Sequence, residues 1–288
     1  MTRRRAGRRA LRARWRRATH HDVDAVARRL AAWPCSPGGL ARHQFVLATL
    51  DTRGPSVLRL AEADGGWAAC LVLPGHLVIP AGDPELVWSA GVPSRRWRIL
   101  VGDAEACEAL LQRWGNDPTM IVHVQRFQTV DPARVPSPRA VPDPGLRPAR
   151  AEDIHGLAEL AVQLHLDDGY GPDPGAAGLR AYRHRMEASV EQGRVLTVGP
   201  LGRPLLKIER AVDSPRHGVQ LSGICVRPER RGAGLGRASV AAAVRQALAV
   251  NPTAPVTLHV RADNQAALRA YAGAGFVDRE EWRLAVRP

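Results

Sequence analysis

The stretch RPERRGAGLGRAS (227–239) holds three glycines within five positions and has arginines on both sides of them. It follows the apolar run VQLSGICV (219–226) and precedes VAAAVRQALAV (240–250), whose composition favours a helix. Glycine lets the main chain adopt positive φ and approach a ligand closely, and the first N–H groups of a helix attract anions. The stretch therefore predicts a phosphate-binding turn between a strand and a helix.

Two common phosphate-binding motifs do not fit this turn. A dinucleotide fingerprint that starts at Gly232 needs a glycine where the chain has Arg237, and too few residues follow it for the rest of a doubly wound domain. A P-loop needs a lysine directly after its last glycine, and this turn contains none. We therefore exclude both classes.

The pattern that does fit is R-x-x-G-x-G, formed by Arg231, Gly234 and Gly236. A second pattern follows in LHVRADNQAALRAYAGAGF (258–276), where a tyrosine stands seven positions after an asparagine and a Gly-Phe pair closes the run. Together they resemble the two signatures of the GCN5-related N-acetyltransferases (GNAT family), close to the ribosomal-protein N-terminal-alanine acetyltransferases. The resemblance covers roughly 145–288. It implies a mixed α/β fold with helices on both faces of the sheet, and acetyl-CoA (coenzyme A) as cofactor.

The resemblance also implies roles at matched positions. The expected cofactor-binding residues are Ile224, Cys225, Val226, Arg231, Gly232, Ala233, Gly234, Leu235, Gly236, Arg237, Asn264 and Tyr271. The main chain at 232–237 would hold the pyrophosphate, and the strand end at 224–226 would pair with the pantetheine arm. As a catalytic residue, Tyr271 would protonate the departing thiolate, because a phenol is protonated at neutral pH.

The general base is the open position. Close relatives carry a glutamate where this chain has His259, and a histidine could accept the proton of an amine at neutral pH. Glu209, Ser222 acting through a water, and Asp167 or Asp168 are the alternatives. We expect direct attack of the amine on acetyl-CoA in a ternary complex, without an acyl-enzyme.

The amine substrate is expected at the loop LDDGYGPDPG (166–175). Asp167, Asp168 and Asp173 would suit a cationic amine, and Tyr170 would form an apolar wall. The same residue types are also ordinary turn formers, so the loop does not identify the acceptor.

Length and composition predict two domains. The chain has 288 residues, enough for two cores, and TVDPARVPSPRAVPDPG (129–145) carries five prolines without apolar periodicity. We expect a disordered basic tail at 1–19, an α/β domain at 20–128, a semi-stiff linker at 129–145 and the acetyltransferase domain at 146–288. Within the last domain, 276–286 is expected to form a pair of strands.

The first half resembles a domain of unassigned role that precedes GNAT domains in some high-GC bacterial proteins, on LRLAEADGGW (58–67) and VLPGHLVIPAGDPE (72–85). Its strands are expected within 56–81, 97–102 and 120–127, and its helices at 20–33 and 104–114. It lacks both signatures, so we predict a degenerate GNAT-like domain that does not bind coenzyme A. A lid or a dimerisation surface, which would make the protein a homodimer, is the alternative use.

Charge and cysteines limit the partners. Nine arginines crowd 3–17, so contact with nucleic acid is expected only through this tail. No apolar run approaches the roughly 20 residues of a membrane span. The four cysteines stand alone, without metal-ligand spacing, which predicts no metal site, no disulfide framework and a reducing, cytoplasmic location.

These observations favour an acetyl-CoA-dependent N-acetyltransferase that acts on a primary amine of a small molecule or a protein. One alternative enzyme resembles mycothiol synthase, a tandem member of the same family. A non-catalytic acyl-CoA-binding regulatory protein is the alternative from another class, and a nucleic-acid-binding protein acting through the arginine tail is the third.

Overall fold

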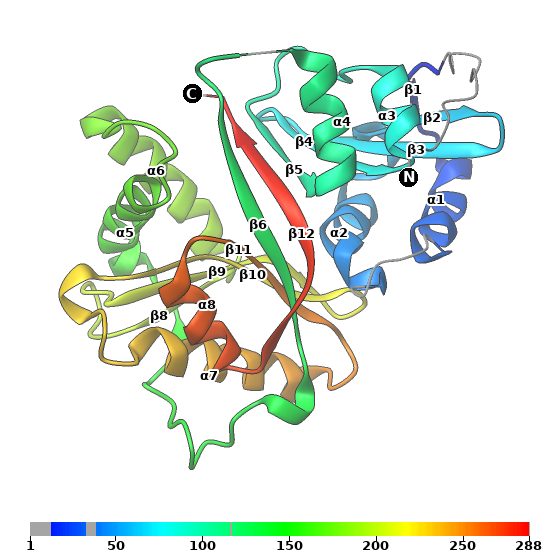
Figure 1. Cartoon of the computed structure of the whole chain (residues 1–288). Helices are drawn as coiled ribbons and strands as arrows, with labels where there is room; N and C mark the ends of the chain where they lie inside the picture. Colours follow the sequence, from blue (N-terminus) through cyan, green and yellow to red (C-terminus); the bar gives the residue numbers. More distant parts are fainter. Residues whose placement is uncertain (1–12, 33–38, 116, 288) are drawn as a thin grey trace, which may run out of the picture. The chain divides into compact units, whose positions relative to one another are not determined.

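The structure is a computed structural model that describes residues 13–32, 39–115 and 117–287 (Figure 1). It contains two compact units. Unit 1 comprises the described residues up to Val124 together with those from Glu281 onward, and unit 2 is Gln125–Glu280. The strands β6 (Ile121–Val130) and β12 (Phe276–Val286) contribute residues to both units. The expected mixed α/β fold is confirmed, although the units do not follow the expected boundaries after residues 128 and 145.

Unit 1 is built on a mostly antiparallel sheet. Its own strands are β1 (Arg16–Arg17), β2 (Leu58–Ala63), β3 (Gly66–Val72), β4 (Leu77–Gly82) and β5 (Ile99–Asp103), paired in that order. Its helices are α1 (His20–Ala32), α2 (Gln44–Arg53), α3 (Pro84–Ala90) and α4 (Ala104–Trp114). β4 and β5 pair in parallel, and the end of β12 pairs antiparallel with β5. Turns at Asp64-Gly65 and Pro74-Gly75 connect β2 to β3 and β3 to β4.

Unit 2 carries the glycine turn. Its own strands are β7 (Arg147–Pro148), β8 (Val195–Val198), β9 (Leu206–Ser214), β10 (Gly218–Val226) and β11 (Val256–Arg261). The sheet order is β6-β11-β10-β9-β8-β7, and only β10 and β11 are parallel among the pairs described. Its helices are α5 (Ile154–Asp167), α6 (Gly175–Glu191), α7 (Leu235–Val250) and α8 (Gln265–Ala272).

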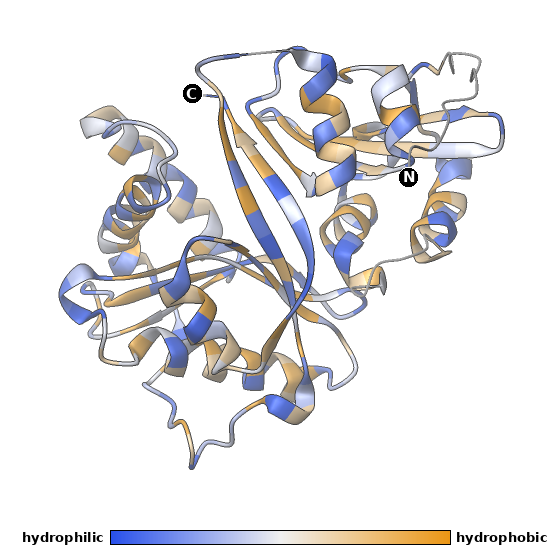
Figure 2. Cartoon of the chain, in the orientation of Figure 1, coloured by the Kyte–Doolittle hydropathy of each residue, from blue (hydrophilic) through white to orange (hydrophobic). Residues whose placement is uncertain are grey.

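Two apolar layers hold the helices of unit 2 against its sheet. α7 buries Val240, Ala241 and Val244 against β8–β11 on one face, and small alanines permit this close packing. α5 and α6 form a second, smaller cluster around Leu157 and Met186. Figure 2 shows the hydrophobic residues along α7 and along the strands near it.

Three expectations require correction. The segment 129–145 is packed within unit 2 and is not a separate linker, because Val141 is buried in the core beneath α7 and the amide of Asp131 donates to the carbonyl of Gly275. Residues 13–19 are ordered in unit 1, where β1 pairs with β2 and Ala18 is buried, whereas residues 1–12 lie outside the described chain. The segment 276–286 is one strand, since it contains no turn-forming residues at its centre.

The helices α2 and α3 were not expected, because neither repeats an apolar residue at helical spacing for long enough. Cys70, Cys107 and Cys225 are free, and Cys35 lies outside the described residues. None of the helices in the described ranges is both long and apolar enough to cross a membrane.

Candidate functional site

The glycine turn leaves the first amides of α7 accessible. Gly232 and Gly234 adopt φ of +78° and +79°, and Gly234 is the N-cap of α7 without any side-chain cap. A Cβ added to either glycine would meet no atom within 4 Å, so both face open space. Gly236 instead packs toward β10, where its Cβ would lie 3.4 Å from Val226. The positive end of α7 and its unsatisfied N–H groups therefore point at a space that a ligand can fill.

That space belongs to a cavity of about 820 Å³ in unit 2. It is lined by every predicted cofactor-binding residue except Ala233, and by Leu164, Asp167, Asp168, Arg230, Arg261, Asp263, Ala266, Ala267, Arg269 and Ala270. The two sequence patterns, which lie apart in the chain, thus meet at one cavity between the start of α7, the end of β10 and α8.

Five arginines make this cavity electropositive. The guanidinium of Arg231 contacts Asp167 at 2.6 Å, and that of Arg261 contacts Asp263 at 2.6 Å. Within the described chain, the other three have no carboxylate partner: Arg230, Arg237 and Arg269. Sequence reasoning had singled out only Arg231 and Arg237; the basic residues that flank each pattern were a signal for the others.

A β-bulge distorts β10 beside the cavity. The pairing of β10 with β9 shifts register between Ser222 and Cys225, and Gly223 adopts φ of +55°. The ladder resumes with Cys225 opposite Lys207. The pairing of β10 with β11 ends at Leu221, so the edge of 224–226 that faces away from β9 can offer main-chain hydrogen bonds to a ligand in the cavity.

α8 contributes two polar groups. Asn264 caps this helix by accepting from the amide of Ala267 at 3.0 Å, and it also lines the cavity. Tyr271 is 8% exposed, and its ring lies 6.1 Å from that of Phe276. Burial raises the pKa of Tyr271, and the nearby charge of Asp168 raises it further. Its hydroxyl is therefore a proton donor at neutral pH.

His259 does not line the cavity. It lies within β11, where its ring is 5.1 Å from that of Phe127 in β6. Burial lowers the pKa of His259 to about 3, so the ring is neutral and a weak base. The geometry argues against the predicted role as general base, because a buried, neutral ring outside the cavity is poorly placed to accept a proton from a substrate there.

The acidic loop is engaged within the protein. Besides the Asp167–Arg231 pair, Asp168 lies 4.0 Å from Arg261. Asp173 accepts from the amide of Gly175 at 2.8 Å, as a turn residue does. Tyr170 does not line the cavity; its ring packs 6.2 Å from that of His165, and burial raises its pKa. Only Asp167 and Asp168 of the predicted substrate residues reach the cavity.

Glu209 has a buried cationic partner. Its carboxylate pairs with Lys207, whose side chain is fully buried, and with the guanidinium of Arg185 at 3.2 Å. Burial by itself raises the pKa of Glu209, but Lys207 and Arg185 together hold it below the usual range. Ser222 lies opposite Glu209 in the β9–β10 ladder.

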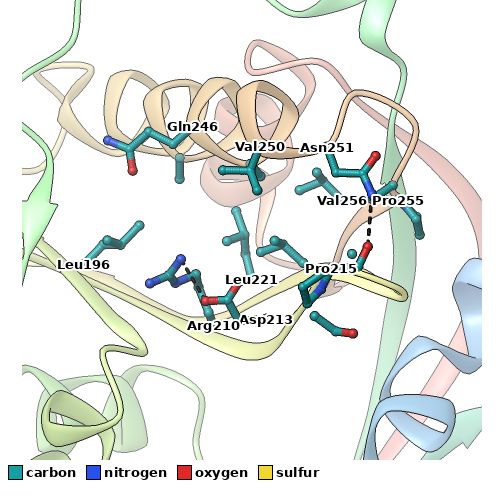
Figure 3. A pocket seen from close by; sticks show the side chains of 16 residues that line it. Leu196, Arg210, Asp213, Pro215, Leu221, Gln246, Val250, Asn251, Pro255 and Val256 are labelled. Carbon is teal, nitrogen blue, oxygen red and sulfur yellow. Dashed lines mark hydrogen bonds and ion pairs between the residues drawn. The ribbon is translucent and has the colours of Figure 1, made fainter. Parts of the chain in front are cut away.

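A smaller cavity of about 250 Å³ lies under the C-terminal end of α7 (Figure 3). Its lining is largely apolar, and its polar groups are paired: Arg210 with Asp213 at 2.9 Å, and Asn251 with the carbonyl of Pro215 at 3.0 Å. None of the predicted site residues lines it. Across the residues that the structure describes, no group of histidines, cysteines and carboxylates is placed to hold a metal.

A comparison with models of known families finds a match in the half of the chain that contains the larger cavity. Residues 201–276 match the model of the acetyltransferase (GNAT) family. Comparison with curated proteins gives no match. Among solved structures, a GCN5-related N-acetyltransferase from Sphaerobacter thermophilus is similar over 96% of both chains, with a TM-score of 0.60 and 16% identity.

Two further structures are similar along most of their length. A GNAT-family acetyltransferase from Colwellia psychrerythraea is matched over 96% of this chain and 100% of its own, with a TM-score of 0.58 and 12% identity. A tandem GNAT protein from the clavulanic acid biosynthesis pathway is matched over 95% and 97%, with a TM-score of 0.53 and 13% identity. At such identities the likeness concerns the fold, and it extends over both units.

Proposed function

Because residues 201–276 carry a GNAT acetyltransferase domain, we propose that this protein is an acetyl-CoA-dependent N-acetyltransferase that acts on a primary amine. The observation that carries the proposal is the start of α7, which is uncapped at Gly234 and opens onto a cavity lined by both sequence patterns. The remaining features of that cavity can be matched to the parts of coenzyme A.

The residues fit a ligand with several phosphates. The main chain at 232–237 would hold the pyrophosphate, since two glycines leave room for it and the dipole of α7 favours negative charge. Arg230, Arg237 and Arg269 would bind the outer phosphates, for which a guanidinium is well suited. The strand end at 224–226 and Asn264 would hold the pantetheine arm. Bound acetyl-CoA would supply the acetyl group as a thioester.

The side chains near the bulge favour direct transfer. Burial raises the pKa of the Cys225 thiol, although Lys207 opposes this, so the thiol stays protonated and is a poor nucleophile. Tyr271 would protonate the departing sulfur, because its hydroxyl is buried and neutral at the cavity. The acceptor amine would therefore form its C–N bond with the acetyl carbon as the C–S bond breaks, without an acyl-cysteine.

Glu209 is the proposed general base. His259 is a neutral, weak base, and Asp167 is paired with Arg231. Glu209 does not line the cavity itself, but it lies opposite Ser222, at the bulge that precedes the cavity-lining residues 224–226. The carboxylate of Glu209 is held ionised beside the bulge, where an amine must lose a proton before it attacks. Unit 1 would be a degenerate GNAT-like domain without a coenzyme A site, because it lacks both sequence patterns.

A regulatory protein that binds acyl-CoA without transferring the acyl group is a second candidate. It is favoured by the acidic loop, whose carboxylates are engaged with arginines and a main-chain amide. Calorimetry with acetyl-CoA, followed by thiol release with a panel of amines, peptides and one glycosylated cysteine, separates the two. Binding with thiol release supports the enzyme; binding without it for every acceptor supports the regulator; and absence of binding contradicts both.

A further inference from the structure

The only lysine of the chain occupies an unusual place. All other basic side chains, histidines aside, are arginines, whereas Lys207 lies in β9 with its side chain fully buried. A buried cation is costly unless it is paired. An ammonium is also more compact than a guanidinium and shifts its pKa more readily. A lysine at this position therefore suggests that the site needs a compact cation, and that this buried cation has a partner.

Glu209 supplies the partner through one oxygen only. Both the ammonium of Lys207 and the guanidinium of Arg185 contact Oε1 of Glu209. Within the described chain, Oε2 accepts no hydrogen bond and forms no ion pair, and it is not among the fully buried, unpartnered atoms. The Glu209 side chain is 17% exposed. One carboxylate oxygen is thus fixed by two cations, and the other is open to an incoming group.

The pair lies directly beneath the bulge of β10. A Cβ built at Gly223 would lie 2.5 Å from Oε1 of Glu209 and 2.8 Å from Nζ of Lys207, so a side chain at 223 would displace the pair. The next three residues of β10 line the cavity, and Cys225 is the cross-strand neighbour of Lys207. The ion pair therefore supports the strand end that we assign to the acyl arm.

The charged and titratable groups around Glu209 come from several elements. Lys207 lies on its own strand, Arg185 and Tyr182 on α6, and Arg194 just before β8. Burial lowers the pKa of Lys207, while the charge of Glu209 raises it. The Arg185 side chain is half-exposed, so water screens the effect of its charge on Glu209. The Lys207 side chain is buried, so its charge acts on Glu209 without that screening.

We propose that Lys207 is a positioning residue for the acetyl transfer: it holds the Glu209 carboxylate ionised beneath Gly223, with Oε2 open to accept a proton from the acceptor amine. The inference rests on the proposed function. The ammonium of the acceptor loses one proton to Oε2, which later releases it to water. The amine then attacks: the C–N bond forms as the C–S bond breaks, and the departing thiolate takes the proton of the Tyr271 hydroxyl. The second proton of the amine restores that hydroxyl. Lys207 itself keeps its proton throughout.

The single lysine permits a direct test without substrate. Protein grown with ¹⁵N-labelled lysine has one side-chain ammonium signal, which reports the charge of Lys207 as pH changes. We expect a charged ammonium at neutral pH, and loss of its proton at lower pH in Glu209→Gln than in the wild type. An identical titration in both proteins would overturn the coupling.

Kinetics test the role. In Lys207→Met, the acid limb of kcat/KM should move to higher pH by about 1 unit or more, because an opposite charge at this distance lowers a carboxyl pKa by roughly 1–3 units. Arg185→Gln, which removes the screened cation from the same oxygen, should shift it less. Lys207→Arg, if it folds, keeps a positive charge at this position, so its acid limb should lie closer to that of the wild type than the limb of Lys207→Met does. The affinity for acetyl-CoA should stay within about twofold of the wild-type value in all three variants.

The outcomes are distinguishable. An unchanged acid limb in active Lys207→Met would overturn the role of Lys207 and leave the proposed function standing. Absence of transfer by the wild type would overturn the proposed function and the role together, whatever the NMR titration shows. If Lys207→Met does not fold, the acid limb of kcat/KM in Arg185→Gln and the titration of the Lys207 ammonium still test the coupling to Glu209, since neither measurement uses that variant.

Discussion

The substitution Gly234→Ala tests whether the glycine turn binds acetyl-CoA, because its effect on protein stability can be measured separately from its effect on affinity. Gly234 adopts φ of +79°, which costs a residue with a Cβ about 1–2 kcal/mol. A methyl group there would meet no protein atom within 4 Å, so no packing clash adds to that cost. The methyl group would instead stand in the space that we assign to the pyrophosphate.

The loss of affinity follows from the amides that the methyl group blocks. A hydrogen bond to a charged group is worth about 1.5–3 kcal/mol, so losing one such bond weakens binding by roughly 10- to 150-fold. Gly193→Ala is the matched control, because Gly193 adopts φ of +64°, also faces open space and does not line the cavity. Both variants should lose a few degrees of Tm, at roughly 2–4 °C per kcal/mol.

Calorimetry with acetyl-CoA and thermal denaturation of the free protein make the comparison. We expect the two variants to lose similar stability, and only Gly234→Ala to lose affinity. Wild-type affinity in Gly234→Ala would refute the assignment of the turn to the phosphates. Equal loss of affinity in both variants would refute it too, because the effect would then come from destabilisation alone.

Four further predictions follow from the same geometry. Tyr271→Phe should lower kcat by roughly 10- to 100-fold with acetyl-CoA affinity nearly unchanged, as stopped-flow thiol release can show; an unchanged kcat removes Tyr271 from catalysis. Arg269→Gln should weaken acetyl-CoA binding and reduce its salt dependence in calorimetry, and an equal salt slope would contradict the phosphate contact. In the folded protein His259 has a pKa of about 3, whereas in the unfolded chain its pKa is about 6.5. Below about pH 6.5 the unfolded chain therefore binds a proton that the folded protein does not, and the free energy of unfolding should fall by roughly 2 kcal/mol between pH 7 and pH 5. Urea denaturation at pH 7 and pH 5 should show that His259→Gln removes this part of the slope while retaining activity; an equal slope or lost activity would argue against our placement. Deleting residues 1–19 should lower the Tm of the protein, because Ala18 and β1 pack within unit 1, and an unchanged Tm would contradict that packing.

The glycine turn and the second pattern were predictable because both depend on local chemistry. Positive φ at Gly232 and Gly234, an uncapped helix start and the N-cap role of Asn264 all follow from residue type and position. The strands β8, β10 and β11 were equally readable, since each is a mainly apolar run bounded by turn residues.

The rest depends on contacts between distant segments. His259 has Phe127 of β6 as its cross-strand neighbour and is buried, and no periodicity within β11 reports that. The prolines at 129–145 suggested a linker, but the valines among them fill a core that only the folded α7 creates. The Lys207–Glu209 pair had one signal in the sequence, a single lysine in an arginine-rich chain, and the bulge that seats it became visible only with the register of β9 and β10.

A crystal structure of the protein with acetyl-CoA tests the central claim most directly. The account predicts the pyrophosphate on the amides of 232–237, the pantetheine arm along the end of β10 and the sulfur within hydrogen-bonding reach of Tyr271. Acetyl-CoA bound in unit 1 or in the small cavity beneath the end of α7, or no bound ligand at a saturating concentration, would contradict it.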